Sequence, residues 1–327
     1  MIELAAIGAR LRAAGLRERA VAAWAGTSRI AALPARIAAM PPHPPTPAAA
    51  VLALLVAGAE LATDQLRTLP GDLVEALIRH ALLERTAEGL RARVAIVPLG
   101  AALLVCDRVD APLARDLVCW PDDSSHHLAT AIPPGRRASW LDLGCGSAFA
   151  PLARPQLADR IHGVDLNERA VHHAQLGAAL SGIAHLTAAR GDAGAPDDVA
   201  DLVTCNAPMP PAPPPLAGAL PELWRHADPG FFARLWPGLA RAVRPGGMIV
   251  VHAACEAMLP ALRAAAGERV IVAYTPGAGG PDEPGHAGFA IGWWRPDAPD
   301  RFVAGHRALT PDRPHLDPRD REDALGR

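Results

Sequence analysis

A glycine-rich turn and a later acid are the residues best placed to do chemistry in this sequence. An apolar run from Trp140 ends in Gly144-Cys145-Gly146, and about twenty residues later a second apolar run ends at Asp165. In a parallel α/β sheet, this arrangement builds a nucleoside site at the carboxyl ends of neighbouring strands. Glycine lets the backbone approach a ligand, and the acid accepts hydrogen bonds from ribose hydroxyl groups. The sequence therefore predicts a site for an adenosine-like ligand.

The spacing of the glycines distinguishes between several motifs that bind nucleoside-containing ligands. A dinucleotide fingerprint needs G-x-G-x-x-G, and Phe149 stands where the third glycine would be. A Walker loop needs a lysine, and the sequence contains none. The run D-L-G-C-G-S from Asp142 instead resembles motif I of class I S-adenosylmethionine (SAM) methyltransferases, with Ala148 where many members carry another glycine. The alternative is a glycine turn in an unrelated α/β protein.

Later segments follow the order of the same family. Gly191-Asp192-Ala193 follows an expected strand, and in the family such an acid or its neighbour meets the adenine amino group. The expected strand 201–206 ends at Asn206, and Arg244-Pro245-Gly246-Gly247 precedes another at 248–252. The segments 270–274 and 289–295 suit a closing pair of strands. The resemblance covers about residues 120–295 and implies a seven-stranded Rossmann-like sheet with helices on both faces. It also implies that S-adenosyl-L-methionine is bound by Asp142, Gly144, Cys145, Gly146, Asp165, Leu166, Asp192, Ala193 and Asn206.

The segment Asn206-Ala207-Pro208-Met209 is the candidate reaction centre. It resembles the N-P-P-Y/F/W motif of the amino-methylating branch, which includes HemK-like glutamine methyltransferases, small-domain rRNA guanine methyltransferases and DNA adenine methyltransferases. The resemblance implies that the asparagine oxygen and the next backbone carbonyl accept hydrogen bonds from a target NH2 group and so orient it. Ala207 replaces the first proline, and Met209 replaces an aromatic residue, which weakens the case for a flipped nucleobase. The alternative reading of Asn206 is a turn-forming residue at a strand end.

A proline-rich stretch follows this segment and predicts a stiff loop over the acceptor pocket. At its end, Trp224, Arg225 and His226 are candidate substrate contacts, beside Ala207, Pro208 and Met209. His226 could act as a general base if the acceptor were a hydroxyl group. A packed tryptophan and a solvated histidine are the alternative.

Length and composition exclude several classes of protein. A chain of 327 residues with 50% hydrophobic content can bury one large core or two modest ones. The net charge of −2 gives no global attraction to nucleic acid. The five cysteines lack C-x-x-C pairing, so we expect neither a disulfide scaffold nor a metal site, and a cytoplasmic location. The longest apolar run, 48–59, is too short to span a bilayer, and no signal peptide is expected.

Three regions are expected along the chain. Residues 1–115 read as helices followed by a hairpin over 91–106, which suggests a winged-helix-like domain. Its mixed charge favours substrate docking or dimerisation over DNA binding. Residues 116–300 are the expected methyltransferase domain. Residues 301–327 are rich in charge and proline and are expected to be partly disordered.

The junction before the methyltransferase motifs carries Asp122, Ser124, Ser125 and the pair His126-His127. In related enzymes this segment folds over the SAM site, which would place a serine near the methionine tail. The alternative is a helix cap made by Asp122 or Ser124. Adjacent histidines point in different directions on a helix, which argues against a two-histidine metal site.

Three functions fit these patterns. The first is SAM-dependent methylation of an amino or amide nitrogen on a protein side chain or an RNA base. The second is a small-molecule N- or O-methyltransferase of specialised metabolism. The third is a SAM-sensing regulator whose N-terminal module binds nucleic acid or protein.

Overall fold

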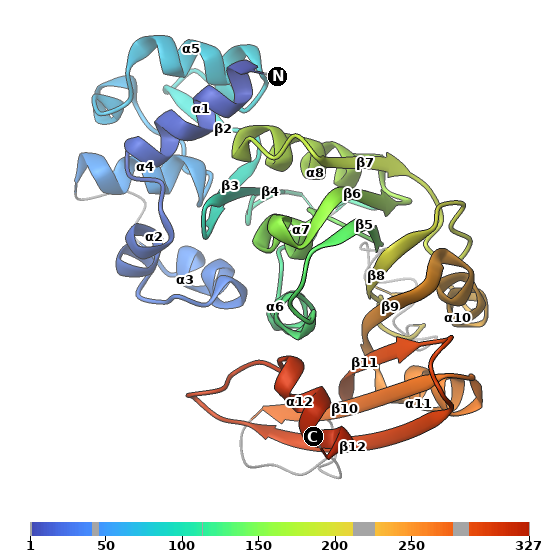
Figure 1. The fold of residues 1–327 in the computed structure, drawn as a ribbon. Coiled ribbons are helices and arrows are strands. Elements are labelled where there is room, and N and C mark those ends of the chain that lie inside the picture. The colour runs from blue at the N-terminus through green and yellow to red at the C-terminus, as the bar shows by residue number, and fades with distance from the viewer. Residues whose placement is uncertain (1, 41–45, 113, 212–225, 277–287, 327) are drawn as a thin grey trace.

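The computed structural model describes residues 2–40, 46–112, 114–211, 226–276 and 288–326 of the chain (Figure 1). Its centre is an eight-stranded sheet with the order β12-β10-β11-β9-β8-β5-β6-β7. Strands β5 to β9 are parallel where they pair, β11 is antiparallel to β9 and to β10, and β12 is parallel to β10. The strands are β5 (Arg137–Leu143), β6 (Ala158–Asp165), β7 (Leu186–Arg190), β8 (Ala200–Asn206), β9 (Val243–Ala254), β10 (Glu268–Pro276), β11 (Phe289–Arg295) and β12 (Arg301–Leu309).

The strand order reverses between β5 and β8. From β5 the chain proceeds to β6 and β7 on one side, and then returns to place β8 and β9 on the other side. In open α/β sheets, ligands bind outside the carboxyl ends of the strands at such a switch point. The order, with an antiparallel strand near one edge, is consistent with a Rossmann-like methyltransferase fold.

Helices cover both faces of the sheet, because successive strand side chains point to opposite faces. On β5, Trp140 belongs to one buried cluster and Leu141 to the other. The helices that follow the N-terminal region are α6 (Asp123–Ala131), α7 (Phe149–Ala153), α8 (Glu168–Ser181), α10 (Phe231–Ala242) and α11 (Cys255–Ala264). The first three pack with the Trp140 cluster, and the last two with the Leu141 cluster.

The N-terminal region shares the core on the α8 side of the sheet. It contains α1 (Ile2–Ala13), α2 (Glu18–Ala25), α3 (Leu33–Ala38), α4 (Pro47–Leu55), α5 (Gly71–Arg79), β1 (Leu83–Arg85), β2 (Leu90–Ala92), β3 (Ala95–Leu99) and β4 (Ala102–Cys106). The hairpin expected over 91–106 is shorter: β3 and β4 pair, while β2 pairs with β1. Every residue of β3 and β4 is buried, and the Leu103 N–H donates to Ser181 Oγ of α8 at 2.8 Å. This hairpin is therefore core and not an exposed wing, while the winged-helix comparison stays a prediction.

The last region corrects two expectations. The sheet has eight strands where seven were expected, and the additional strand β12 lies in the segment that was expected to be partly disordered. Helix α12 (Pro318–Leu325) follows it. Here Arg321 pairs with Glu268 of β10, and Asp320 accepts from Arg307 of β12 at 2.6 Å. The charges that suggested disorder are paired with one another, which composition does not reveal.

Among the described helices, none is long and apolar enough to cross a membrane.

Candidate active site

The glycine turn after β5 lies at the switch point of the sheet. Gly144 and Gly146 have φ angles of +67° and +51°, the left-handed region that favours glycine. The Gly144 N–H donates to the Val164 carbonyl at 2.8 Å, and this bond ties the turn to β6. A Cβ built on either glycine would meet nothing within 4 Å. Open space therefore borders the backbone of the turn, as the approach of a ligand requires.

Ala148 shows why the family pattern places a further glycine after this turn. It has φ +57° and ψ +44° at the start of α7 and is fully buried. A left-handed conformation costs a residue with a Cβ about 1–2 kcal/mol. The Ala148 N–H donates to the Cys145 carbonyl at 2.7 Å, so alanine adopts this turn conformation at that cost.

Asp165 ends β6 and faces the glycine turn. Its Oδ2 accepts the Gly146 N–H at 2.8 Å, and its Oδ1 accepts the Asn167 N–H at 2.9 Å. Burial raises the pKa of Asp165, and the two N–H donors act against that rise. An ionised carboxylate has about four lone-pair sites, so it retains capacity for further donors such as hydroxyl groups. The next residue, Leu166, is 42% exposed.

Asp142 lies beneath the same turn and is 4% exposed. Its Oδ1 accepts the Thr204 hydroxyl at 2.5 Å, and Thr204 Oγ1 in turn accepts the Trp140 indole N–H at 2.6 Å. Burial raises the pKa of Asp142 to about 7, although the Thr204 hydrogen bond opposes the rise. A nearby positive charge would shift this acid to its ionised form.

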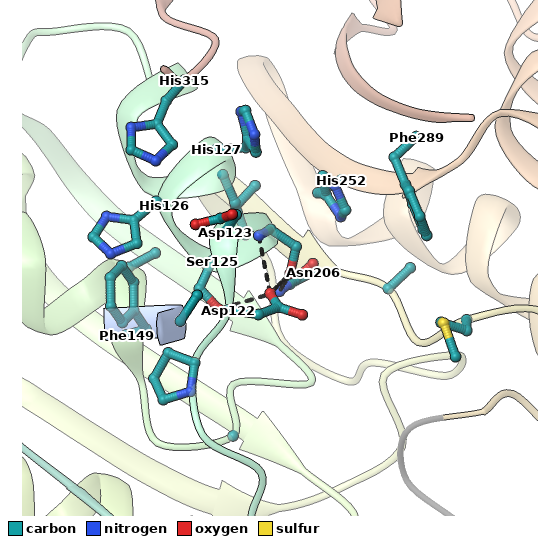
Figure 2. A pocket seen from close by; sticks show the side chains of 18 of the residues that line it. Asp122, Asp123, Ser125, His126, His127, Phe149, Asn206, His252, Phe289 and His315 are labelled. Atoms are coloured by element: carbon teal, nitrogen blue, oxygen red, sulfur yellow. Dashed lines mark hydrogen bonds between the residues drawn. The ribbon is translucent and has the colours of Figure 1, made fainter. Parts of the chain in front are cut away.

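Asn206 ends β8 and is held by the first turn of α6. Its Nδ2 donates to Ser124 Oγ at 2.8 Å and lies 3.5 Å from Ser125 Oγ. The Ser124 hydroxyl donates to Asp122, whose Oδ1 also accepts the Ser124 N–H at 2.9 Å and caps α6. Because the Ser124 proton goes to Asp122, Ser124 Oγ is an acceptor for the amide, which fixes the side-chain orientation of Asn206. Figure 2 labels Asp122 and Asn206 in this part of the cavity. No described residue donates to Asn206 Oδ1.

The helix cap expected for this junction is confirmed, since Asp122 is the N-cap of α6. Ser124 also contacts Asn206, while a serine near the methionine tail of SAM stays a prediction. One short segment therefore starts a helix and orients Asn206.

A cavity of about 1710 Å³ joins these groups. It is lined by most of the residues expected from the sequence: Asp142, Gly144, Cys145, Gly146, Asp165, Asn206, Ala207, Pro208 and Met209. Four expected residues are outside its lining: Leu166, Asp192, Ala193 and His226. Trp224 and Arg225 lie outside the described residues.

The residues outside the lining have other partners. Asp192 Oδ1 accepts the Gly194 N–H at 2.8 Å, and Ala193 is buried in the core beside α10. His226 Nδ1 lies 2.9 Å from the Pro210 carbonyl oxygen, and His226 forms a bridge with Met209. Contacts of these residues with a cofactor or substrate stay predictions.

The other end of the cavity carries an aromatic cluster that sequence reasoning missed. It consists of His127, His252, Tyr274, Phe289 and His315 (all but Tyr274 labelled in Figure 2). The rings of His127 and Tyr274 stack at 4.0 Å, and those of His252 and Phe289 at 5.4 Å. Burial lowers the pKa of His127 to about 3 and that of His252 to about 4, so both are neutral at pH 7. The one available signal was that His252, Tyr274 and Phe289 lie at strand ends.

No group of three or more metal-binding side chains that could hold a metal ion occurs among the described residues.

No family model and no curated protein matches the chain. The 16S rRNA N2 methyltransferase RsmC of T. thermophilus, in complex with AdoMet and guanosine, is 19% identical with a TM-score of 0.41, covering 64% of this chain and 46% of its own. The N-methyltransferase NodS of Bradyrhizobium japonicum, in complex with S-adenosyl-L-homocysteine, is 17% identical with a TM-score of 0.38, covering 53% and 85%. A ribosomal protein L11 methylase of Lactobacillus delbrueckii subsp. bulgaricus is 13% identical with a TM-score of 0.35, covering 53% and 76%. Likenesses this distant assign no activity to this chain.

Proposed function

We propose that this protein is a SAM-dependent methyltransferase that acts on an amino or amide nitrogen, carried by a protein side chain or an RNA base. The observation that supports it most is one cavity lined by the glycine turn, by Asp165 and by Asn206. These groups come from three strands, and the carboxyl ends of parallel strands meet at one edge of the sheet.

The residues of the turn fit the proposed cofactor. Gly144 and Gly146 leave open space beside the backbone, and Asp165 retains acceptor capacity for ribose hydroxyls. Asp142, with its raised pKa, would become ionised beside a positively charged amino acid tail. When bound, SAM supplies a methyl group on a positively charged sulfur.

Asn206 would orient the methyl acceptor. Its Nδ2 is occupied by Ser124, so Oδ1 is the end of the amide that is free to accept an N–H from the acceptor. The Ala207 carbonyl follows directly and would accept the second hydrogen. Two fixed acceptors aim the nitrogen lone pair away from themselves, which is catalysis by positioning.

The free Oδ1 of Asn206 supports nitrogen over oxygen as the methylated atom, because it can accept a hydrogen of an amino group. The nitrogen attacks the methyl group with its lone pair and gives up one proton to water after the transfer. His226, the base predicted for a hydroxyl acceptor, lies outside the cavity lining with Nδ1 close to the Pro210 carbonyl oxygen, so a hydroxyl route would have to use one of the cavity histidines.

Two experiments test the proposal. Calorimetry with SAM and S-adenosylhomocysteine should show binding of both by the full chain. Transfer of tritiated methyl groups from SAM into fractionated cell extract should then label one class of molecule: protein, RNA or small molecules.

Asn206→Ala separates catalysis from ligand sensing. We expect transfer to fall about 100-fold or more, as for other lost transition-state contacts, while SAM affinity changes little. Unchanged transfer by Asn206→Ala would show that the amino-group contact is wrong. Binding of SAM without transfer by the wild type would favour a regulator.

A further inference from the structure

His252 carries a buried nitrogen that the proposed reaction does not yet use. It lies near the end of β9, in register with Asn206 of β8, and lines the cavity at 3% exposure. Its Nε2 lies 2.8 Å from the Tyr274 hydroxyl oxygen. Its Nδ1 is buried, and no described residue forms a hydrogen bond with it.

An unpaired polar atom in this position needs an explanation. A buried donor or acceptor without a partner costs about 1–3 kcal/mol. The ring cannot easily turn to relieve this cost, because Phe289 stacks on it at 5.4 Å with an interplanar angle of 14°. His127 lies on the same side of the sheet, with its ring centroid 6.4 Å from that of His252.

The hydrogen-bond partner of Nε2 determines whether Nδ1 carries the ring hydrogen and so whether it donates or accepts. The Tyr274 hydroxyl has one hydrogen, and His252 Nε2 is its only hydrogen-bond partner in the part of the chain that the structure describes. If Tyr274 donates this hydrogen, Nε2 is the acceptor nitrogen of a neutral imidazole, and the ring hydrogen is on Nδ1. Nδ1–H is then a buried donor on the residue paired in register with Asn206, whose Oδ1 is free to accept.

We propose that His252 binds the methyl acceptor through Nδ1–H, while Asn206 Oδ1 receives the amino group of the same molecule. This inference rests on the proposed function and specifies its substrate class. Neighbouring strands lie about 4.8 Å apart, so the two contacts suit groups on adjacent atoms of one small planar unit.

The donor and acceptor pair selects a particular chemistry. The acceptor molecule must present an amino group next to a hydrogen-bond acceptor, as in a carboxamide or in a heterocycle with a ring nitrogen beside its amino group. An alkylammonium ion, or an aromatic amine without that neighbour, would leave Nδ1–H unpaired. Burial keeps His252 neutral, because it lowers the imidazole pKa to about 4, so a neutral molecule is favoured.

Calorimetry on the full chain saturated with S-adenosylhomocysteine tests this inference with simple probes. Benzamide and cytosine carry the predicted pair of groups, and aniline carries the amino group alone. The wild type should bind benzamide or cytosine at least about tenfold more tightly than aniline, the value of one hydrogen bond of about 1.4 kcal/mol.

Substitutions of His252 test whether the preference for benzamide or cytosine depends on its Nδ1 atom. His252→Phe keeps a ring for packing and should weaken binding of the preferred probe about tenfold. His252→Asn retains a donor near the Nδ1 position and should restore most of that binding. His172→Phe, at an exposed position of α8 outside the cavity lining, is the matched control and should bind like the wild type. Thermal unfolding checks that each variant folds; if His252→Phe does not, the benzamide-to-aniline ratio of the wild type decides.

The outcomes are distinct. Equal probe binding by the wild type and His252→Phe, or no preference over aniline, overturns the role of His252 even though S-adenosylhomocysteine binds. No binding of benzamide or cytosine overturns it as well. Failure of the wild type to bind S-adenosylhomocysteine overturns the proposed function itself, and the inference falls with it.

Discussion

At the scale of single residues, Asp142 would couple its own ionisation to binding of the proposed cofactor. Burial against the sheet raises its pKa to about 7, while Thr204 supplies one hydrogen bond to its Oδ1. Near pH 7, about half of the molecules therefore carry a proton on this acid. A cationic ligand stabilises the ionised form and expels that proton.

We therefore expect SAM binding at pH 7 to release up to about half a proton. Calorimetry in buffers with different ionisation enthalpies, such as phosphate and Tris, measures the number directly. Asp142→Asn has no titrating group at this position and should show a smaller release. Proton uptake by the wild type would contradict the contact between Asp142 and a cationic group.

At the scale of elements, the start of α6 has two roles, helix capping and orientation of Asn206, and mutations can test them separately. Asp122 caps the helix and also holds the Ser124 hydroxyl that orients Asn206. Asp317 caps α12 in the same way, accepting the Arg319 N–H at 2.9 Å, with no bond to Asn206. The two N-cap residues therefore differ in one respect: only Asp122 is linked, through Ser124, to Asn206.

Replacing either cap with alanine should lower the free energy of unfolding by about 1 kcal/mol. Only Asp122→Ala should also reduce methyl transfer, because Asn206 then loses its fixed orientation. Urea denaturation and the tritiated-methyl assay measure the two effects on the same samples. Equal loss of transfer in Asp317→Ala would mean that activity follows stability and not the orientation of Asn206.

At the scale of the whole molecule, buried neutral histidines link stability to pH. Burial lowers the pKa of His127 to about 3, and those of His173 and His252 to about 4, from an ordinary 6.5. Between these values the unfolded chain binds more protons than the folded one, so acid favours unfolding. Asp142 acts in the opposite sense, since its raised pKa contributes stability that is present below pH 3.8 and is lost as pH rises through about 7.

We expect the free energy of unfolding to fall as pH falls from about 6.5 towards 4, by up to about 1.4 kcal/mol per pH unit for each histidine. Urea denaturation at pH 5, 6 and 7 measures the slope. His173→Gln, at a residue that does not line the cavity, should make the slope shallower, and Asp142→Asn should make it steeper. A slope that His173→Gln leaves unchanged would show that this histidine titrates normally in the folded state.

The sequence by itself determined the residues that end short apolar runs, because that pattern is visible within a few positions of the chain. The glycine turn, Asp165 and Asn206 each end a short apolar run, and parallel strands bring such ends to one edge of a sheet. Strand ends therefore predicted most of the cavity lining on the β5, β6 and β8 side. Asp192 follows β7, the edge strand beyond β6 from the switch point, and His226 lies in a loop; the structure places both outside that lining.

Only the tertiary structure decided the other half of the cavity and the edge of the sheet. His127, His252 and His315 come from a helix, a strand and the segment after β12, and they meet only because β9, β10 and β11 pair beneath α6. The charged composition of residues 301–327 predicted disorder. In the structure, Arg307 pairs with Asp320 of α12, and Arg321 pairs with Glu268 of β10. Such contacts depend on long-range pairing of side chains, and neither composition nor local periodicity carries that information.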